Sequence, residues 1–133
     1  TIDYIGLPDD IAIEISIFSH APHGAATGSS AAVCVAVAAA LDALTPGRRT
    51  AHELAYVAHA VETEKLGQQS GIQDQLAAAY GGINLIEMYA YPQATVHPIC
   101  LPMTTRYELE PRLVLIYFGQ PHHSSAVHET VIR

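Results

Sequence analysis

Residues 22–37, PHGAATGSSAAVCVAV, join a turn of small residues directly to a long apolar run. Gly24 and Gly28 permit backbone dihedral angles that other residues avoid, and Ser29 and Ser30 place hydroxyl groups where the apolar run begins. The free amide groups and the dipole at the start of a helix attract negative charge. The pattern is typical of a serine-capped helix after an ordinary turn, and it is also compatible with a loop that holds an anion. This segment alone leaves both structures open.

Three helices are predicted downstream of this turn. The first run is apolar nearly all round and too long for a strand, and the turn TPGRR (45–49) ends it. Thr50 is a typical cap for the second, whose apolar residues are spaced as on one helix face, and Gly81 with Gly82 can close the third. The predicted helices cover residues 29–44, 51–66 and 72–80.

Strands are predicted on both sides of the helices. Isoleucines at every second position of DIAIEISIF (10–18) give the clearest strand pattern in the chain, with one face buried. After the helices, β-branched and aromatic content predicts further strands. These later strands cover residues 83–90, 94–101 and 112–119. The order of elements indicates an α+β fold in which the helices pack on one face of a mixed or antiparallel sheet.

Composition limits the class of protein. A chain of 133 residues is the usual size of one domain, and no stretch of 18 apolar residues lacks a polar interruption. Six Lys and Arg against 13 Asp and Glu give a net charge of −7, which argues against nucleic acid or a membrane as the main partner but allows a small anionic ligand. Cys34 and Cys100 are isolated, so we expect reduced thiols in a cytoplasmic protein. The oligomeric state is not set by the sequence.

Carboxylates suggest a magnesium site. Glu62 and Glu64 lie at the end of the second predicted helix and Asp74 opens the third, so they can converge across the loop GQQSG (67–71). Mg²⁺ prefers oxygen ligands, usually one or two carboxylates together with substrate phosphates. Charged residues at helix ends are commonly solvated, but Asp74 lies between two glutamines in a segment of small and apolar residues. Asp74 is therefore the strongest candidate of the three.

Two other chemistries find little support. Among the eight histidines, His20 with His23 and the group His122, His123 and His128 lack acidic or cysteine partners at a recognised zinc-ligand spacing. Serine-hydrolase chemistry is not indicated, because the serines at 29 and 30 are not framed by G-x-S-x-G at the end of a strand.

Two ordered motifs resemble those of the GHMP kinases. PHGAATGSSAA (22–32) resembles their nucleotide-phosphate loop, and ETEKLGQQSGIQDQLAAAYGG (62–82) resembles their catalytic segment. GIQDQLAAAYGGIN (71–84) is most similar to the members that phosphorylate D-glycero-D-manno-heptose 7-phosphate at its anomeric hydroxyl, and ELEPRLVLIYFGQPHHSS (108–125) resembles a later segment of the same kinases. The resemblance implies a ribosomal protein S5 domain 2-like fold and an ATP- and Mg²⁺-dependent sugar kinase.

The resemblance also implies roles for particular residues. Asp74 matches the family's catalytic aspartate, which acts as a base or orients the accepting hydroxyl. Ser30 and Glu62 match the Mg²⁺ ligands, with Glu64 as the alternative if the register shifts by one or two residues. The residues that match the nucleotide-binding loop are Pro22, Gly24, Ala25, Ala26, Thr27, Gly28, Ser29 and Ser30.

The chain also departs from the family pattern. Ala26 and Thr27 stand where the loop usually has Gly and Leu, and His122 and His123 replace a basic residue of the later segment. The family's N-terminal substrate motif and its C-terminal glycine-rich motif are missing. We therefore expect residues 1–133 to form one domain, a partial ATP-binding N-terminal domain that runs into the central segment, without the C-terminal GHMP domain.

Two alternatives remain open for the function. The chain can belong to a GHMP kinase for another acceptor, of the mevalonate, galactose or fucose type, since fold and family do not fix the substrate. It can also be a degenerate nucleotide-binding module without turnover. For a kinase, we expect the partner to be a small-molecule substrate, either a sugar or sugar phosphate or, for a mevalonate-type kinase, another small alcohol.

Overall fold

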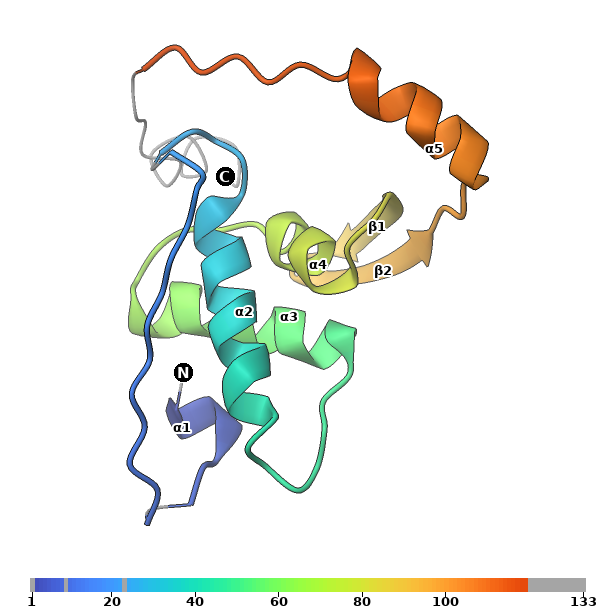
Figure 1. Ribbon diagram of the computed structural model, residues 1–133. Helices are drawn as coiled ribbons and strands as arrows, with labels where there is room; N and C mark the ends of the chain where they lie inside the picture. The colour runs from blue at the N-terminus through green and yellow to red at the C-terminus, as the bar shows by residue number, and fades with distance from the viewer. Residues whose placement is uncertain (1, 9, 23, 120–133) are drawn as a thin grey trace.

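A computed structural model describes residues 2–8, 10–22 and 24–119 of the chain. Helices form the body of the molecule and a two-stranded antiparallel sheet follows them along the chain (Figure 1). The architecture is α+β, as the sequence predicts. The elements are, in order, α1 (Ile2–Ile5), α2 (Ser29–Asp42), α3 (Ala51–Ala60), the π-helical turn η1 (Val61–Lys65), α4 (Gln73–Tyr80), β1 (Asn84–Ala90), β2 (Gln93–Pro98), α5 (Met103–Leu109) and the 3₁₀ turn η2 (Glu110–Arg112).

All three helices predicted from the sequence are present. The second begins with a capping box, in which the Thr50 hydroxyl accepts from the amide of Glu53 and the Glu53 carboxylate accepts from the amide of Thr50. It then continues from α3 into η1, so helical structure covers nearly the whole predicted range. Gly81 ends α4 with φ of 63°, a conformation that glycine adopts at little cost.

Two apolar clusters hold the helices together. In the first, Leu76 of α4 and Ile72, the residue just before this helix, are fully buried against α3 and the sheet. The paired residues Ile86 and Val96 pack onto this cluster from β1 and β2. In the second, α1, α2 and α3 meet around Ile5, Ala38 and Leu41. Small residues at these interfaces let the helix backbones approach closely, which brings the start of α2, η1 and the start of α4 into one region.

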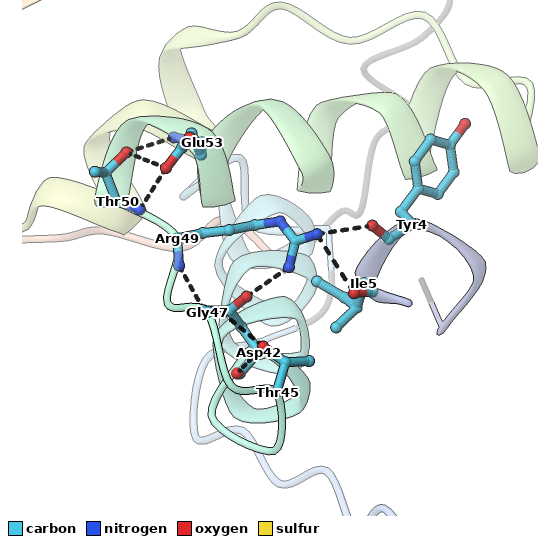
Figure 2. Close-up of polar contacts among 8 residues, drawn as sticks. All are labelled: Tyr4, Ile5, Asp42, Thr45, Gly47, Arg49, Thr50 and Glu53. Carbon is cyan, nitrogen blue, oxygen red and sulfur yellow. Dashed lines mark hydrogen bonds and ion pairs between the residues drawn. The ribbon is translucent and has the colours of Figure 1, made fainter. Parts of the chain in front are cut away.

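A polar network fixes the turn between α2 and α3. The Arg49 guanidinium lies 2.6 Å from the Asp42 carboxylate, and the Arg49 amide donates to the same carboxylate at 2.8 Å (Figure 2). The other guanidinium nitrogen donates to the carbonyl oxygens of Tyr4 and Ile5. The hydrogen bond from the Arg49 amide, followed by the contacts of its guanidinium, lowers the pKa of Asp42. One arginine thus ties the end of α2, the turn and α1 together.

The sheet is smaller than predicted. β1 and β2 form a hairpin in which Leu85 faces His97 and Glu87 faces Thr95, and they confirm the strands expected at 83–90 and 94–101. The predicted strands at 10–18 and 112–119 are wrong: residues 10–18 belong to no helix or strand, and in the second segment Arg112 ends η2 and residues 113–119 belong to no helix or strand. A strand exists only when a neighbour accepts and donates its backbone hydrogen bonds, and neither segment has one in the described part of the chain.

The two unpaired segments keep their apolar character. Residues 10–20 run along one side of α2 (Figure 1). Ile13 and Ile17 of this segment line a groove together with Val33 and Val37 of the helix. Residues 113–118, which include Phe118 at 89% exposure, follow α5 with their side chains in solvent. Helix α5 itself was not predicted. It begins after Pro102, and the Arg106 and Glu110 side chains, four residues apart, form an ion pair along it.

Candidate functional site

The loop before α2 has alternating left-handed residues. Gly24, Ala26 and Gly28 have φ of 70°, 55° and 66°. Glycine adopts this conformation readily, whereas alanine does so at a cost of about 1 kcal/mol. Left-handed residues that alternate with ordinary ones turn successive backbone N–H groups toward one side, which is the geometry of anion-binding concavities.

No serine caps α2. Gly28 occupies the N-cap position, where no side-chain hydrogen bond is made, and Ser29 and Ser30 are the first two helical residues. The serine-capped alternative is therefore wrong. Gly28 accepts the first helical bond from Ala32 at 2.9 Å, while the amides of Ser29 and Ser30 have no acceptor within the described ranges. These amides are available to an anion at the positive end of the helix dipole.

The hydroxyl of Ser30 reaches across to the π-helical turn instead. It donates to Oε1 of Glu62 at 2.7 Å, and this bond joins the first turn of α2 to η1. Glu62 is 2% exposed and forms no ion pair with any described residue. A buried carboxylate without a cation depends on neutral donors. The other donors are the amide of Gln75, the hydroxyl of Ser70 at 3.3 Å and the thiol of Cys34 at 3.8 Å.

Cys34 lies one helical turn after Ser30 and faces the same carboxylate oxygen. Burial raises the pKa of the Cys34 thiol to about 11, and the charge of Glu62 adds to the rise. The thiol is therefore protonated at neutral pH and acts as a weak donor beside Glu62.

Asp74 lies in the first turn of α4, close to Gly28 of the loop that precedes α2. A methyl group built on Gly28 would lie 3.3 Å from Cγ of Asp74 and 3.4 Å from its Oδ2. The absence of a side chain at Gly28 therefore lets the aspartate approach the start of α2. Asp74 is exposed, so its carboxylate can meet a ligand in solution.

The alternative metal ligand, Glu64, is placed elsewhere. Its carboxylate accepts a hydrogen bond from the Tyr4 hydroxyl, and this bond, ahead of burial, raises the pKa of Tyr4. The structure brings Glu62 and not Glu64 to Ser30. Within residues 2–8, 10–22 and 24–119, no group of three or more His, Cys, Asp and Glu side chains is arranged to hold a metal ion by itself. His23, His122, His123 and His128 lie outside the described residues.

The first 82 residues match a known family. The family model described as "GHMP kinases N terminal domain" covers residues 2–82, which is more than half of the chain. The chain belongs to the GHMP kinase family. The matched range contains the loop at 22–30 and the acidic residues Glu62 and Asp74, so the family assignment and the geometry concern the same part of the molecule.

Two curated relatives are similar to this GHMP kinase chain. It is 29% identical over 119 residues to the D-glycero-alpha-D-manno-heptose 7-phosphate kinase of Campylobacter jejuni, a match that covers 90% of this chain and 35% of the relative. It is 42% identical over 72 residues to the mevalonate kinase of Pyrococcus horikoshii, covering 54% of this chain and 21% of the relative. The chain thus spans about a third or less of the relatives it matches. No solved structure matches it significantly.

Three residues of the site escaped the sequence-based prediction. Gln75, Ser70 and Cys34 all hydrogen-bond to Glu62, and none was assigned a role. The signal for Gln75 was present in the sequence, because it is an amide in an otherwise apolar helix directly after Asp74. Ser70 and Cys34 give no such signal, since a loop serine and a helical cysteine are ordinary residues in their places.

None of the helices within the described residues is long and apolar enough to cross a bilayer. Both cysteines are free thiols, Cys34 half-buried and Cys100 exposed.

Proposed function

We propose that this chain carries the nucleotide- and metal-binding part of an ATP-dependent sugar kinase. The reaction transfers the γ-phosphoryl group of ATP to a hydroxyl of a sugar or sugar phosphate. The observation that carries the proposal is the 2.7 Å bond between the Ser30 hydroxyl and the Glu62 carboxylate at the open end of α2. The bond brings two oxygen-bearing side chains together beside the free amides at the start of α2, and membership of a small-molecule kinase family supports the same reaction.

The residues of the site suit the needs of phosphoryl transfer, which are mainly positioning and neutralisation of charge. The loop from Pro22 to Ser30, whose backbone is left-handed at every second residue from 24 to 28, would surround the phosphates. Ser30 and Glu62 would hold Mg²⁺, which supplies charge neutralisation when bound. Asp74 would take the proton of the acceptor hydroxyl or orient that hydroxyl for attack.

The acceptor proposed first is the anomeric hydroxyl of a heptose 7-phosphate. The support is the match to the heptose 7-phosphate kinase, which extends over 90% of the chain and so beyond the nucleotide loop. A mevalonate-type acceptor is the second candidate. It is supported by the higher identity, 42%, over the shorter match to a mevalonate kinase.

The alternative to an enzyme is a degenerate nucleotide-binding module without turnover. The observation in its favour is Ala26, which adopts φ of 55° at a position where a methyl group is strained. A chain that binds ATP but transfers no phosphoryl group would favour this alternative, and so would a loop that fails to bind the nucleotide, because such a loop supports no transfer.

Further features belong to the same proposal. We place residues 1–133 in one domain of the ribosomal protein S5 domain 2-like type and the reaction in the cytoplasm, where the two unpaired cysteines would stay reduced. The support for the fold type is the family match together with the α2–α3–α4 body and the antiparallel hairpin.

Calorimetric titration tests the proposal. The chain is titrated with ATP and with a non-hydrolysable ATP analogue, each with and without Mg²⁺. We expect saturable binding that strengthens with Mg²⁺, and a loss of that Mg²⁺ effect of at least about 10-fold in Ser30→Ala and in Glu62→Gln. Glu64→Gln is the matched control, since this neighbouring glutamate faces Tyr4. Equal Mg²⁺ dependence in all four proteins would remove Ser30 and Glu62 from the metal site.

A further inference from the structure

Gln75 is a polar residue with no exposed surface. Its side chain is fully buried, as are those of Ile72 and Leu76, the other two largest fully buried side chains among the described residues. Burial of an amide costs free energy unless its hydrogen-bonding groups are satisfied. The reason for a glutamine at this position must therefore lie in its partners.

Those partners satisfy the nitrogen of the Gln75 amide but not its oxygen. Nε2 donates to Oε2 of Glu62 and, at 3.0 Å, to the hydroxyl of Ser70. Oε1 has no hydrogen-bond partner in the described structure. An unsatisfied buried oxygen destabilises the folded chain, so much of what the Nε2 bonds contribute to folding is offset. A methionine of similar length would fill the same space without that penalty.

With the bond from Gln75, both carboxylate oxygens of Glu62 accept a hydrogen bond. Ser30 holds Oε1 from α2, while Gln75 holds Oε2 from α4, and Ser70 adds a longer contact to Oε2. A carboxylate that is held on both oxygens cannot rotate freely about its last bond. Side chains that orient a metal ligand in this way typically contribute 10- to 100-fold to metal affinity.

We propose that Gln75 is a positioning residue for the metal site: its buried amide fixes the Glu62 carboxylate in the orientation that faces Ser30. The inference rests on the proposed function, because it assigns to Glu62 the role of a Mg²⁺ ligand. Ser70 supports the same arrangement, since its hydroxyl lies within hydrogen-bond distance of both Glu62 and Gln75.

The test measures binding of Mn²⁺, a paramagnetic substitute for Mg²⁺, to the 133-residue chain in the presence of a non-hydrolysable ATP analogue. Free Mn²⁺ is followed by electron paramagnetic resonance, and melting is recorded for every protein. Gln75→Met removes the donor at similar length, and Gln75→Asn keeps an amide that is one methylene too short to reach Glu62. Gln73→Met is the matched control, because Gln73 lies on the same helical turn and makes no hydrogen bond to Glu62.

We expect Mn²⁺ affinity to fall at least 10-fold in Gln75→Met and in Gln75→Asn, with cooperative melting retained, and to stay within 2-fold of the wild type in Gln73→Met. Wild-type affinity in whichever Gln75 variant folds would overturn the inference and leave the proposed function intact. A wild-type chain that binds no Mn²⁺, or one whose affinity is unaffected by Glu62→Gln, would overturn the proposed function and this inference with it.

Discussion

The Ser30 hydroxyl lies 2.7 Å from Oε1 of Glu62, although 32 positions separate the two residues in the chain. The bond connects the first turn of α2 to a π-helical turn that follows α3. π-helical turns occur frequently at functional sites, because the extra residue turns a side chain away from the regular helical direction. Here the turn contains the buried carboxylate around which the donors of α2, α4 and the 67–71 loop gather.

Replacement of Asp74 by asparagine tests the catalytic assignment. We expect Asp74→Asn to leave the dissociation constant of the nucleotide within about 2-fold and to lower kcat at least about 100-fold in any preparation with measurable phosphoryl transfer. The reason is that an amide keeps the shape of the side chain but accepts no proton. Steady-state kinetics with paired nucleotide titrations provide the measurement. Unchanged turnover would contradict the role of Asp74.

Gly28 offers a test of the approach between the loop and Asp74. Gly28→Ala introduces left-handed strain and, in addition, a methyl group 3.3 Å from the Asp74 carboxyl carbon. Gly67→Ala is the control, since Gly67 has a similar φ of 64° and open space around the added methyl group. We expect both variants to lose about 1 kcal/mol of unfolding free energy from strain.

The further loss expected only in Gly28→Ala measures the contact with Asp74, and denaturant titration gives both values. In the background Asp74→Ala that further loss should disappear, because the aspartate carboxyl group is gone. Identical losses for Gly28→Ala and Gly67→Ala would show that the aspartate does not approach the loop in solution.

Ala26 is predicted to carry strain that glycine would relieve. We expect Ala26→Gly to be about 1 kcal/mol more stable than Ala25→Gly, because φ of 55° costs a non-glycine residue about that much, and only position 26 has a positive φ. Both variants lose a similar free energy through the greater entropy of the unfolded chain, so the difference between them reports the strain. Thermal melting of the two variants decides the matter, and an Ala26→Gly chain that is no more stable than Ala25→Gly would contradict the left-handed geometry.

The Cys34 thiol should react slowly in the folded protein. Its pKa is raised from 9.0 to about 11, mainly by burial and then by Glu62, so at pH 8 the thiolate fraction is about 100-fold below that of the unfolded chain. In Cys100→Ser, where Cys34 is the remaining thiol, we expect alkylation by iodoacetamide to be at least about 10-fold slower in buffer than in urea. Adding Glu62→Gln should raise the folded-state rate. Equal rates in buffer and urea would contradict the burial of this thiol beside Glu62.

The Asp42 and Arg49 pair predicts a dependence of stability on pH. Because the pKa of Asp42 is lowered in the folded state, its contribution is fully present above the ordinary aspartate range and is lost as pH falls through the lowered value. We expect Asp42→Asn to melt below the wild type at pH 7 and to show a smaller further decline in melting temperature between pH 5 and pH 2. Asp10→Asn, at an exposed position, is the control. Parallel declines in all three proteins would contradict the prediction.

Local signals were sufficient to predict α2, α3 and α4. The capping pair Thr50 and Glu53, the apolar run after Ser29 and the glycine at position 81 act within a few residues of themselves, so the sequence predicts α2, α3 and α4 nearly to their ends. Local patterns predicted β1 and β2 but were not sufficient for the other two expected strands. DIAIEISIF at 10–18 alternates as a strand should, but strand formation depends on a neighbour that is distant in the chain, and this segment has none in the described structure.

For the candidate site, the sequence by itself determined which chemical groups are present and which of them match the motifs of the GHMP kinases, including Ser30, Glu62 and Asp74. Tertiary structure decided their arrangement. It brought Glu62 to Ser30 and Glu64 to Tyr4, because the two glutamates differ by two positions and therefore point to different sides of one helical turn. It also brought in Gln75, whose bond to Glu62 depends on how α4 packs against α2 and α3. Such packing reflects contacts between residues far apart in the sequence, and no local pattern encodes them.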